Sequence, residues 1–259
     1  MPPTPFALVT SATRGLSLAL TRRLLQTTDL PLFATHRSGT GDELKKHILA
    51  PLKDVDPARL HPLQLDLTDE ASVQAAADTL AGTLPPDSYI DTAFFTGGVL
   101  HPEKQPADLD LWKITESFQV NTIAHLLLIK HFARFVPPAA KNRDDIPLAK
   151  WVHVSARVAS ISDNRSGGWY SYRASKAALN QVIRTWDWQL RMQKKPAICV
   201  GVHPGTMKTE LSRPYWESTS KEKLFEPEYS AERLVDVVKN LKEEQRGKVW
   251  DYKGEEVPP

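Results

Sequence analysis

Short apolar runs alternate with helical patterns along most of this chain, and this alternation restricts the possible folds more than any other feature. Apolar runs predict strands at residues 6–10, 32–35, 60–65, 90–95, 151–154 and 197–202. Helical patterns occupy residues 16–26, 42–49, 71–81, 109–135 and 172–192. Strands that alternate with helices pair in parallel through right-handed crossovers. We therefore predict an α/β fold with a doubly wound parallel sheet flanked by helices.

The length and composition fit one globular domain. The 259 residues carry a formal net charge of +2, so neither a nucleic-acid partner nor an anionic membrane surface is predicted. No apolar run approaches membrane-spanning length, and the first residues lack a basic segment followed by an apolar one. The single cysteine, Cys199, excludes a disulfide framework. We expect a cytoplasmic single domain over residues 1–259, with an exposed insertion at 141–147.

Tyr172 and Lys176 form a candidate catalytic pair. They are four residues apart at the predicted start of a helix, so the phenol and the ammonium lie on one face, one turn apart. A nearby cation favours the ionised form of an acid. We therefore expect Lys176 to lower the pKa of Tyr172 and suit it to proton transfer near neutral pH. The alternative is a solvated tyrosine beside an ordinary surface lysine, because this spacing alone is common.

The turn after the first predicted strand is a candidate phosphate site. It reads Thr10-Ser11-Ala12-Thr13-Arg14-Gly15-Leu16-Ser17 and leads into a helix. Backbone amides and a helix N-terminus at such a turn face the carboxyl edge of the sheet, where they bind phosphate. The predicted contacts of a phosphate-bearing cofactor in this turn are Thr10, Ser11, Thr13, Arg14, Gly15 and Leu16.

Further motifs follow along the chain in a fixed order. They are Asp66-Leu67-Thr68 after the third predicted strand, Gly97-Gly98 after the fourth, Asn121 in the long central helix, Tyr172-x-x-x-Lys176, and His203-Pro204-Gly205-x-x-x-Thr209 after the sixth. Together with Val9-Thr10-x-x-x-Arg14-Gly15, this order resembles the short-chain dehydrogenase/reductase superfamily over nearly the full chain. Within it, the chain is most similar to the C-factor-like and sniffer-like carbonyl reductases. The resemblance implies a single-domain Rossmann-type fold.

The resemblance implies a catalytic role for three residues. Tyr172 is expected to give a proton to a carbonyl oxygen during reduction. Lys176 is expected to lower the pKa of Tyr172 and to hydrogen-bond the nicotinamide ribose. Asn121 is expected to hold a water relay to Lys176; the alternative is a helix asparagine that faces solvent. Hydride transfer itself belongs to the cofactor.

The resemblance also implies cofactor contacts beyond the first turn. Asp66 and Leu67 are expected to flank the adenine, and Gly97 to contact the cofactor. The residues expected to line the nicotinamide and diphosphate end are Pro204, Gly205 and Thr209.

Two turns depart from the superfamily pattern. Ser11 and Ser17 stand where the first and third glycines of the glycine-rich turn are usual, and serine lacks the freedom of glycine at positive φ. After the fourth strand, the usual Asn-Asn-Ala-Gly is replaced by Phe95-Thr96-Gly97-Gly98, which changes two polar side chains. Cofactor binding is still predicted, because serine is small and its hydroxyl can bond a phosphate.

The position of the usual catalytic serine is the main departure. It aligns with Ala156 in the segment Val152-His153-Val154-Ser155-Ala156-Arg157. Side chains alternate along a strand, so Ser155 should point away from the side that position 156 faces, unless the strand end twists. Ser155 is predicted as the substitute catalytic hydroxyl, with Ser160 as an alternative. Loss of an oxyanion donor commonly costs about 10²–10³ in rate, so a slow enzyme or a non-catalytic relative stays open.

Two arginines predict which nicotinamide cofactor binds. Arg14 precedes Gly15, and Arg37 follows the second strand, where NAD-preferring relatives usually place an acidic residue. Two guanidinium groups near the adenosine 2′ position pair with a phosphate, so NADPH is predicted over NADH. The alternative is two solvated surface arginines.

The sequence thus predicts an NADP(H)-dependent oxidoreductase that interconverts a carbonyl and an alcohol of a small molecule, or else a cofactor-binding relative without turnover. No metal is predicted, because the eight histidines form no constellation. The helices at 109–135 and 172–192 carry many apolar positions and resemble the pair that forms a four-helix interface in this superfamily. We expect a homodimer or homotetramer with isologous contacts. Residues 239–248 are predicted as a solvated helix face.

Overall fold

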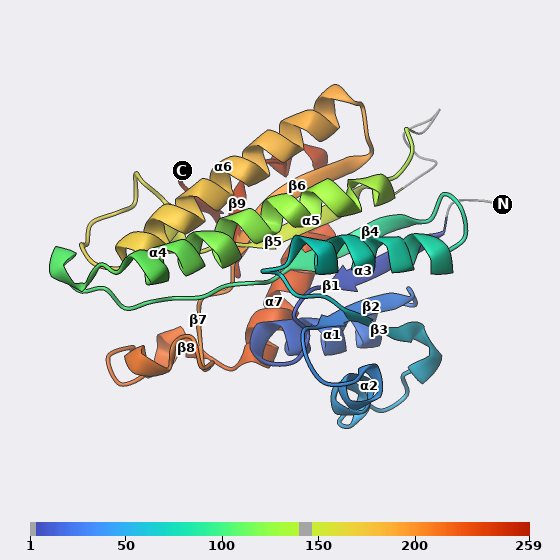
Figure 1. Ribbon diagram of the computed structural model, residues 1–259, viewed down its shortest axis with the longest axis horizontal. Helices are drawn as coiled ribbons and strands as arrows, with labels where there is room; N and C mark the ends of the chain where they lie inside the picture. The colour runs from blue at the N-terminus through green and yellow to red at the C-terminus, as the bar shows by residue number, and fades with distance from the viewer. Residues whose placement is uncertain (1–3, 140–146) are drawn as a thin grey trace.

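The computed structural model describes residues 4–139 and 147–259, so the predicted insertion at 141–147 lies outside them apart from its last residue. The chain forms an α/β fold around an eight-stranded sheet of order β10-β9-β6-β5-β4-β1-β2-β3 (Figure 1). The strands of this sheet are β1 (Pro5–Val9), β2 (Leu32–His36), β3 (Leu60–Gln64), β4 (Tyr89–Phe95), β5 (Ala149–Val154), β6 (Ala197–His203), β9 (Val249–Asp251) and β10 (Glu256–Val257). The α-helices are α1 (Gly15–Thr27), α2 (Gly41–Leu49), α3 (Glu70–Thr83), α4 (Leu111–Phe118), α5 (Ala124–Phe132), α6 (Tyr170–Met192) and α7 (Pro227–Asn240).

All pairs in this sheet are parallel except β9 with β10, so the predicted doubly wound α/β fold is confirmed. The six predicted strands correspond to β1 to β6. The chain runs from β1 outward through β2 and β3, and then returns to place β4 on the other side of β1. This reversal of strand order leaves a crevice at the carboxyl ends of β1 and β4, which is where ligands bind in open parallel sheets.

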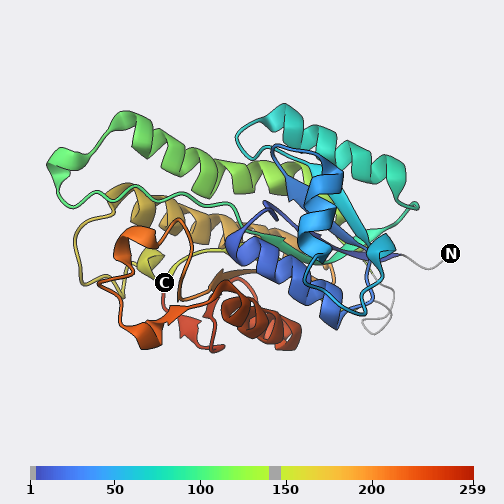
Figure 2. The same ribbon diagram turned by 90° about the horizontal axis from the view of Figure 1, so that it is seen from below.

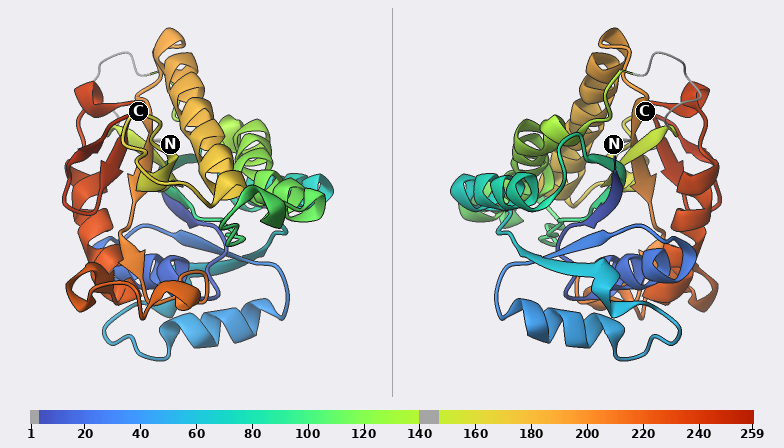
Figure 3. Two further views of the ribbon diagram at one scale, coloured as in Figure 1. Left: turned by 90° about the vertical axis from the view of Figure 1, so that its left-hand side faces the viewer. Right: turned by 90° about the vertical axis from the view of Figure 1, so that its right-hand side faces the viewer.

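The helices cover both faces of the sheet, and each face has its own core. Alternate residues of β1 show the division, because Phe6 and Leu8 belong to one buried cluster while Ala7 and Val9 belong to the other. The first cluster includes side chains of α3, α5 and α6, and the second includes side chains of α1, α2 and α7. Figures 2 and 3 show the two helical layers on opposite sides of the sheet.

Short polar residues fix where several helices begin. The Thr40 hydroxyl accepts from the Glu43 amide, and the Glu43 carboxylate accepts from the Thr40 amide, which completes a capping box before α2. Asp69 caps α3 through the Ala71 amide. Asp110 caps α4 through the Lys113 amide.

The predicted helix at 109–135 is in fact interrupted. Between α4 and α5 the chain makes a π-helical turn over Gln119–Ile123, and a 3₁₀ turn follows α5 at Ala133–Phe135. One extra residue in a helical turn leaves the apolar pattern almost unchanged, so the periodicity of the sequence does not predict it. Such π turns often occur at functional sites, and this one contains Asn121.

The prediction of a solvated helix face at residues 239–248 is wrong. Helix α7 ends at Asn240, and the chain then turns inward toward β9. The Arg246 side chain is buried and its Nε donates to both carboxylate oxygens of Asp187 on α6, at 3.1 and 2.8 Å. A buried ion pair made by distant residues leaves no local pattern, which is why charge counting placed this segment in solvent.

Candidate active site

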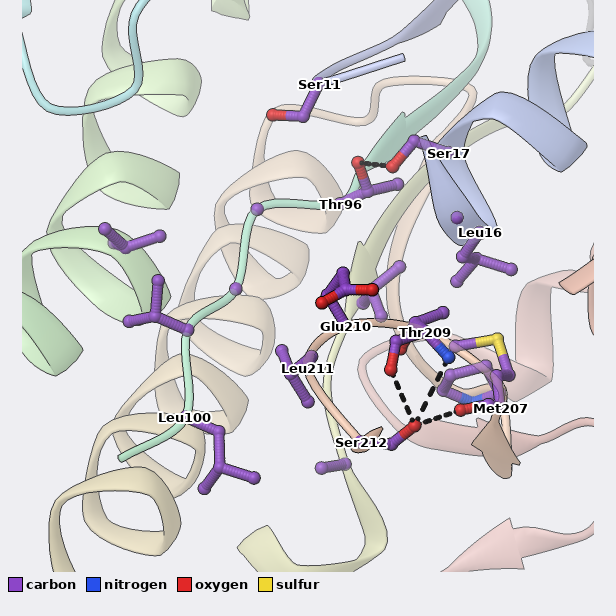
Figure 4. A pocket seen from close by; sticks show the side chains of 18 of the residues that line it. Ser11, Leu16, Ser17, Thr96, Leu100, Met207, Thr209, Glu210, Leu211 and Ser212 are labelled. Carbon is purple, nitrogen blue, oxygen red and sulfur yellow. Dashed lines mark hydrogen bonds between the residues drawn. The ribbon is translucent and has the colours of Figure 1, made fainter. Parts of the chain in front are cut away.

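A cavity of about 1080 Å³ opens at the crevice between β1 and β4 and extends along the carboxyl ends of β5 and β6 (Figure 4). Most of the predicted site residues line it. These are Ser11, Thr13, Arg14, Gly15, Leu16, Arg37, Asp66, Leu67, Gly97, Ser155, Tyr172, Lys176, Pro204, Gly205 and Thr209. Thr10 and Asn121 are fully buried behind the wall, and Ser160 is buried and lies outside the lining.

The turn between β1 and α1 has the shape that the glycine-rich pattern requires, although only Gly15 remains. Ser11 adopts φ 53° and Gly15 adopts φ 55°, both in the left-handed region. A non-glycine residue there costs about 1–2 kcal/mol. Strand β2 holds Ser11 in place, because the Ser11 amide donates to Thr35 Oγ1 at 2.9 Å. The turn is therefore kept open toward the cavity by its neighbour rather than by glycine.

Thr10 and Ser17 both secure this turn through hydrogen bonds to Thr96; Ser17 also lines the cavity, whereas Thr10 does not. The Thr96 hydroxyl donates to the Thr10 carbonyl at 2.5 Å, and the Thr96 amide donates to Thr10 Oγ1 at 3.0 Å. Ser17 Oγ donates to Thr96 Oγ1 at 2.7 Å, as Figure 4 shows. Thr96 and Ser17, which both depart from the superfamily pattern, thus form one hydrogen-bonded unit that ties α1 to the end of β4.

The rim near β2 and β3 carries the predicted adenine contacts. Burial raises the pKa of Asp66, but hydrogen bonds from Thr68 and the positive charge of Arg37 outweigh it and hold the pKa below its usual value. Leu67 presses on Gly97, where a Cβ would lie 2.3 Å from the Leu67 side chain. A residue larger than glycine at position 97 would require the Leu67 side chain to move. Arg14 and Arg37 are both exposed at this end of the cavity.

Helix α6 presents Tyr172 and Lys176 to the cavity. It begins at Tyr170, two residues before the predicted start, after Trp169 in the left-handed conformation at φ 54°. Lys176 is 2% exposed, and its Nζ donates to the carbonyl of Val154 at 2.8 Å and to that of Gly97 at 3.5 Å. The lysine ammonium therefore joins the chain just after β4 to the end of β5.

The pKa of Tyr172 differs from the sequence-based expectation. Burial raises the pKa of Tyr172 to about 12, and burial lowers the pKa of Lys176 to about 7. The expected lowering of the tyrosine pKa by Lys176 is absent, and desolvation of the phenol alone sets the direction of its shift. Tyr172 thus keeps its proton at neutral pH, whereas Lys176 titrates near neutrality.

Asn121 links three segments beside Lys176. Its Nδ2 donates to the Val99 carbonyl and to Ser175 Oγ, both at 3.0 Å, and its Oδ1 accepts from the Val99 amide at 2.9 Å. A Cβ at Gly98 would lie 3.6 Å from Lys176 Nζ and 3.7 Å from Asn121 Oδ1. The side chain of Asn121 faces the protein interior and not solvent, and it approaches the ammonium across Gly98. Its role in a water relay stays a prediction.

The two serines proposed as substitutes for the missing hydroxyl both have other partners. Ala156 forms part of the cavity wall. Ser155 Oγ donates to Asn180 Oδ1 at 2.6 Å. Ser160 Oγ donates to the carbonyl oxygen of Pro259 at 3.2 Å and accepts from the Asp163 amide at 3.0 Å. Each hydroxyl therefore already donates its proton to an oxygen of the protein and not into the cavity.

The segment after β6 is folded over the cavity and contributes residues between Pro204 and Thr219 to its lining. A small parallel sheet joins β7 (Thr206–Met207) to β8 (Leu224–Phe225). Ser212 Oγ accepts from Trp216 Nε1 at 2.9 Å and donates to the Met207 carbonyl, and Figure 4 shows it reaching back into this segment. These bonds give a definite shape to the part of the wall that covers the substrate side.

Aromatic and histidine side chains near Tyr172 were missed at the sequence level. Trp169 packs edge-on against Tyr172 and against Tyr215, with ring centroids 6.2 and 4.8 Å apart. His125 and His153 form a buried pair with 2.8 Å between their Nδ1 atoms. Burial and the charge of Lys176 lower the pKa of His153 to about 3, so it stays neutral. Such contacts join residues that are far apart in sequence, so the spacing of residues along the chain does not predict them.

Neither a metal site nor a membrane-spanning helix is found among the residues that the structure describes. No group of three or more His, Cys, Asp or Glu side chains gathers there as a metal site would need. Within the same residues, no helix is long and apolar enough to cross a bilayer.

A doubly wound sheet with a cavity at its switch point is typical of α/β proteins that bind nucleotide cofactors, and comparisons with known proteins identify the family. The family model for short chain dehydrogenases matches residues 5–220. The NADPH-bound carbonyl reductase from chicken fatty liver is 28% identical, with 99% of this chain and 100% of that chain covered at a TM-score of 0.84. The carbonyl reductase Sniffer of D. melanogaster is 24% identical, with 99% and 100% covered at a TM-score of 0.84. The C-signal protein of Myxococcus xanthus is 30% identical over 151 residues, which is 58% of this chain and 81% of that protein. This chain belongs to the short chain dehydrogenase family and is an oxidoreductase by class.

Proposed function

We propose that this protein is an NADPH-dependent reductase of small carbonyl compounds, with Tyr172 as the proton donor. The observation that carries the proposal is that Tyr172 and the buried Lys176, one turn apart on α6, both line the switch-point cavity. A carbonyl reductase that holds NADPH has the same fold at 28% identity, which supports the cofactor.

The residues around the cavity fit a dinucleotide. Ser11 and Gly15 hold left-handed backbone conformations in the first turn, and Gly97 packs closely against the Leu67 side chain. We expect Arg14 and Arg37, which line the cavity, to pair with a 2′-phosphate. When bound, NADPH supplies the hydride that reduces the carbonyl carbon.

The side chains of the protein supply the proton. Tyr172 is protonated at neutral pH, because burial raises its pKa to about 12, so its hydroxyl can donate to the carbonyl oxygen as the carbon–oxygen double bond becomes single. The proton leaves Tyr172 and becomes the hydroxyl proton of the alcohol. Lys176, with a pKa lowered by burial to about 7, is suited to return a proton to the tyrosinate. Asn121 positions the segment at Val99 that adjoins Lys176.

A second candidate function is a cofactor-binding relative without turnover. Ala156 favours it, because no hydroxyl stands at the position of the usual catalytic serine. The two functions differ in what NADPH does after it binds. A non-catalytic protein binds NADPH and leaves every carbonyl unchanged.

The substitution Tyr172→Phe tests the proposal. We expect wild-type protein to oxidise NADPH in the presence of activated carbonyls such as quinones or α-dicarbonyls. Tyr172→Phe should abolish this turnover and leave the NADPH dissociation constant nearly unchanged, because only the proton donor is lost. Absorbance of NADPH measures turnover, and its fluorescence measures binding.

Tyr170→Phe is the matched control, because Tyr170 lies on the same helix, is 39% exposed and is outside the cavity lining. It should keep full activity. Wild-type protein that binds NADPH but reduces no carbonyl in a broad panel would establish the non-catalytic alternative.

A further inference from the structure

A carbonyl that accepts a proton from Tyr172 alone lacks the second donor that such reactions use. Removal of one donor to a developing oxyanion commonly costs about 10²–10³ in rate. Ala156 offers no donor, and the hydroxyl protons of Ser155 and Ser160 bond Asn180 and Pro259. A working site therefore needs another hydroxyl at this cavity.

Tyr215 carries such a hydroxyl. It lies in the folded segment over the cavity, at the end of a 3₁₀ turn over Arg213–Tyr215, and it lines the same cavity as Tyr172. Its OH atom is buried, and the Trp169 indole acts on it as a donor, which lowers the pKa of Tyr215 against the larger raising effect of burial. Among the described residues the phenol proton itself has no acceptor. A buried donor without an acceptor costs about 1–3 kcal/mol, so its presence at a cavity wall points to a ligand.

Trp169 places Tyr215 on the same side of the cavity as Tyr172. Its indole ring packs edge-on against both phenol rings, at 6.2 Å from Tyr172 and 4.8 Å from Tyr215. The indole N–H can only donate, so Trp169 makes no use of the Tyr215 proton. Trp169 is itself anchored, because its amide donates to the Glu103 carbonyl at 2.7 Å.

The backbone around Tyr215 is also fixed. The Tyr215 amide donates to the Ser212 carbonyl at 2.9 Å, and the Thr219 hydroxyl donates to the Tyr215 carbonyl at 2.8 Å. Trp216 donates from its indole to Ser212 Oγ. The phenol is thus held at the wall by its own segment and by Trp169, as a positioned donor must be.

We propose that Tyr215 donates the second hydrogen bond to the carbonyl oxygen of the substrate, in place of the serine that Ala156 replaces. This inference rests on the proposed reductase function. Tyr172 transfers its proton to the oxygen, whereas Tyr215 keeps its proton and stabilises the negative charge that develops there. The donor then comes from the segment over the cavity instead of from the end of β5.

The substitution Tyr215→Phe tests this role, because it removes the hydroxyl and keeps the ring against Trp169. With NADPH and an α-diketone that the wild-type enzyme reduces, we expect kcat to fall by about 10². The NADPH dissociation constant should stay within about twofold of the wild-type value, since the lost bond is made to the substrate oxygen. Tyr229→Phe is the control, because Tyr229 is 45% exposed and lies outside the cavity lining.

The second arm restores a hydroxyl at position 156. Ala156→Ser in the Tyr215→Phe background should recover at least about tenfold in kcat, and it should give a smaller gain in the wild-type background. This non-additivity shows that the two hydroxyls serve one oxygen. A purely structural role of Tyr215 would show no such rescue. If the double variant fails to bind NADPH, the role of Tyr215 is judged only from the single variants. In that case kcat must fall in Tyr215→Phe and stay unchanged in Tyr229→Phe.

Several outcomes would overturn the inference. Tyr215→Phe with kcat within about threefold of wild type removes Tyr215 as a donor; the reductase function survives this result if Tyr172→Phe is inactive. If Tyr215→Phe changes KM and leaves kcat unchanged, Tyr215 only binds the substrate, and its role as a donor to the developing negative charge is excluded. Wild-type protein without any turnover ends both the function and the role of Tyr215.

Discussion

Arg14 and Arg37 line the cavity as exposed side chains, and the proposed preference for NADPH rests on them. Arg37 lies close enough to Asp66 to lower the pKa of that carboxyl. A 2′-phosphate near this rim would give both guanidinium groups an anion to pair with. A 2′-hydroxyl offers no such charge. We therefore expect discrimination between NADPH and NADH to depend on the charge of these two side chains.

The substitution Arg37→Asp should weaken NADPH binding by about 10- to 100-fold, because a hydrogen bond to a charged group contributes about 1.5–3 kcal/mol. NADH binding should change much less. Fluorescence titration of both cofactors gives the two dissociation constants. Lys53→Asp is a matched control, since Lys53 is exposed and outside the cavity lining. Equal affinities for NADPH and NADH in the wild-type protein would contradict the prediction.

Burial of Lys176 predicts how the stability of the protein changes with pH. Burial lowers its pKa to about 7 from the model-compound value of 10.5. Between these values the unfolded chain binds a proton that the folded chain does not, so the free energy of unfolding rises with pH across this window. Below about pH 7 both states hold the proton and the penalty for burying the charge is complete.

Lys176→Met removes this titration. Relative to the variant, the ligand-free wild-type protein should gain up to about 1.4 kcal/mol of stability per pH unit between about pH 7 and pH 10. Urea unfolding of both proteins at several pH values measures the difference. Parallel stability curves for the two proteins would show that Lys176 is not buried as described.

At the scale of the elements, the sequence predicts those helices and strands whose residue pattern lies within one continuous segment of the chain. Strands β1 to β6 are apolar runs, and the pairing of Tyr172 with Lys176 follows from the spacing of one helical turn. Both are local, and the strand positions are confirmed. The π turn at Gln119–Ile123 adds one residue to an otherwise regular pattern and leaves no signal. Strands β9 and β10 have three and two residues, too few for a period to show.

Features of the candidate site that depend on one segment were likewise predictable, and contacts between distant segments were not. The glycine-poor turn was predicted to bind phosphate from its place in the chain, but its support by Thr35 and Thr96 depends on neighbouring strands. From the spacing we expect the charge of Lys176 to lower the pKa of Tyr172, whereas in the structure desolvation raises the pKa of Tyr172 and lowers that of Lys176. The contact of Trp169 with Tyr215 joins α6 to the segment after β7 and could not be found from either segment alone.

At the scale of the whole molecule, one side of the helical layer carries apolar side chains in solvent. Helices α4 and α5 and the π turn between them expose Leu111 by 79%, Trp112 by 65%, Ile123 by 40% and Leu126 by 47%. On α6, Trp188 is 43% exposed and Met192 is 75% exposed. Soluble proteins seldom leave a large apolar patch uncovered, so this surface favours association. The sheet face below these helices is already filled by other side chains of the same elements.

We therefore expect two copies to associate through α4, α5 and α6 about a twofold axis, as a homodimer or as one half of a homotetramer. An isologous contact of this kind places each helix against its own copy or its neighbour, so one charged substitution acts twice in every dimer. Leu126→Arg should weaken association at micromolar concentration, because each new cation would lose its water in an apolar interface. Ile161→Arg, at an 80% exposed residue in the loop after β5, is the control and should leave the mass unchanged. Light scattering measures the mass of each protein. A wild-type mass near 29.0 kDa at these concentrations would mean that the apolar surface of α4 and α5 serves no self-association.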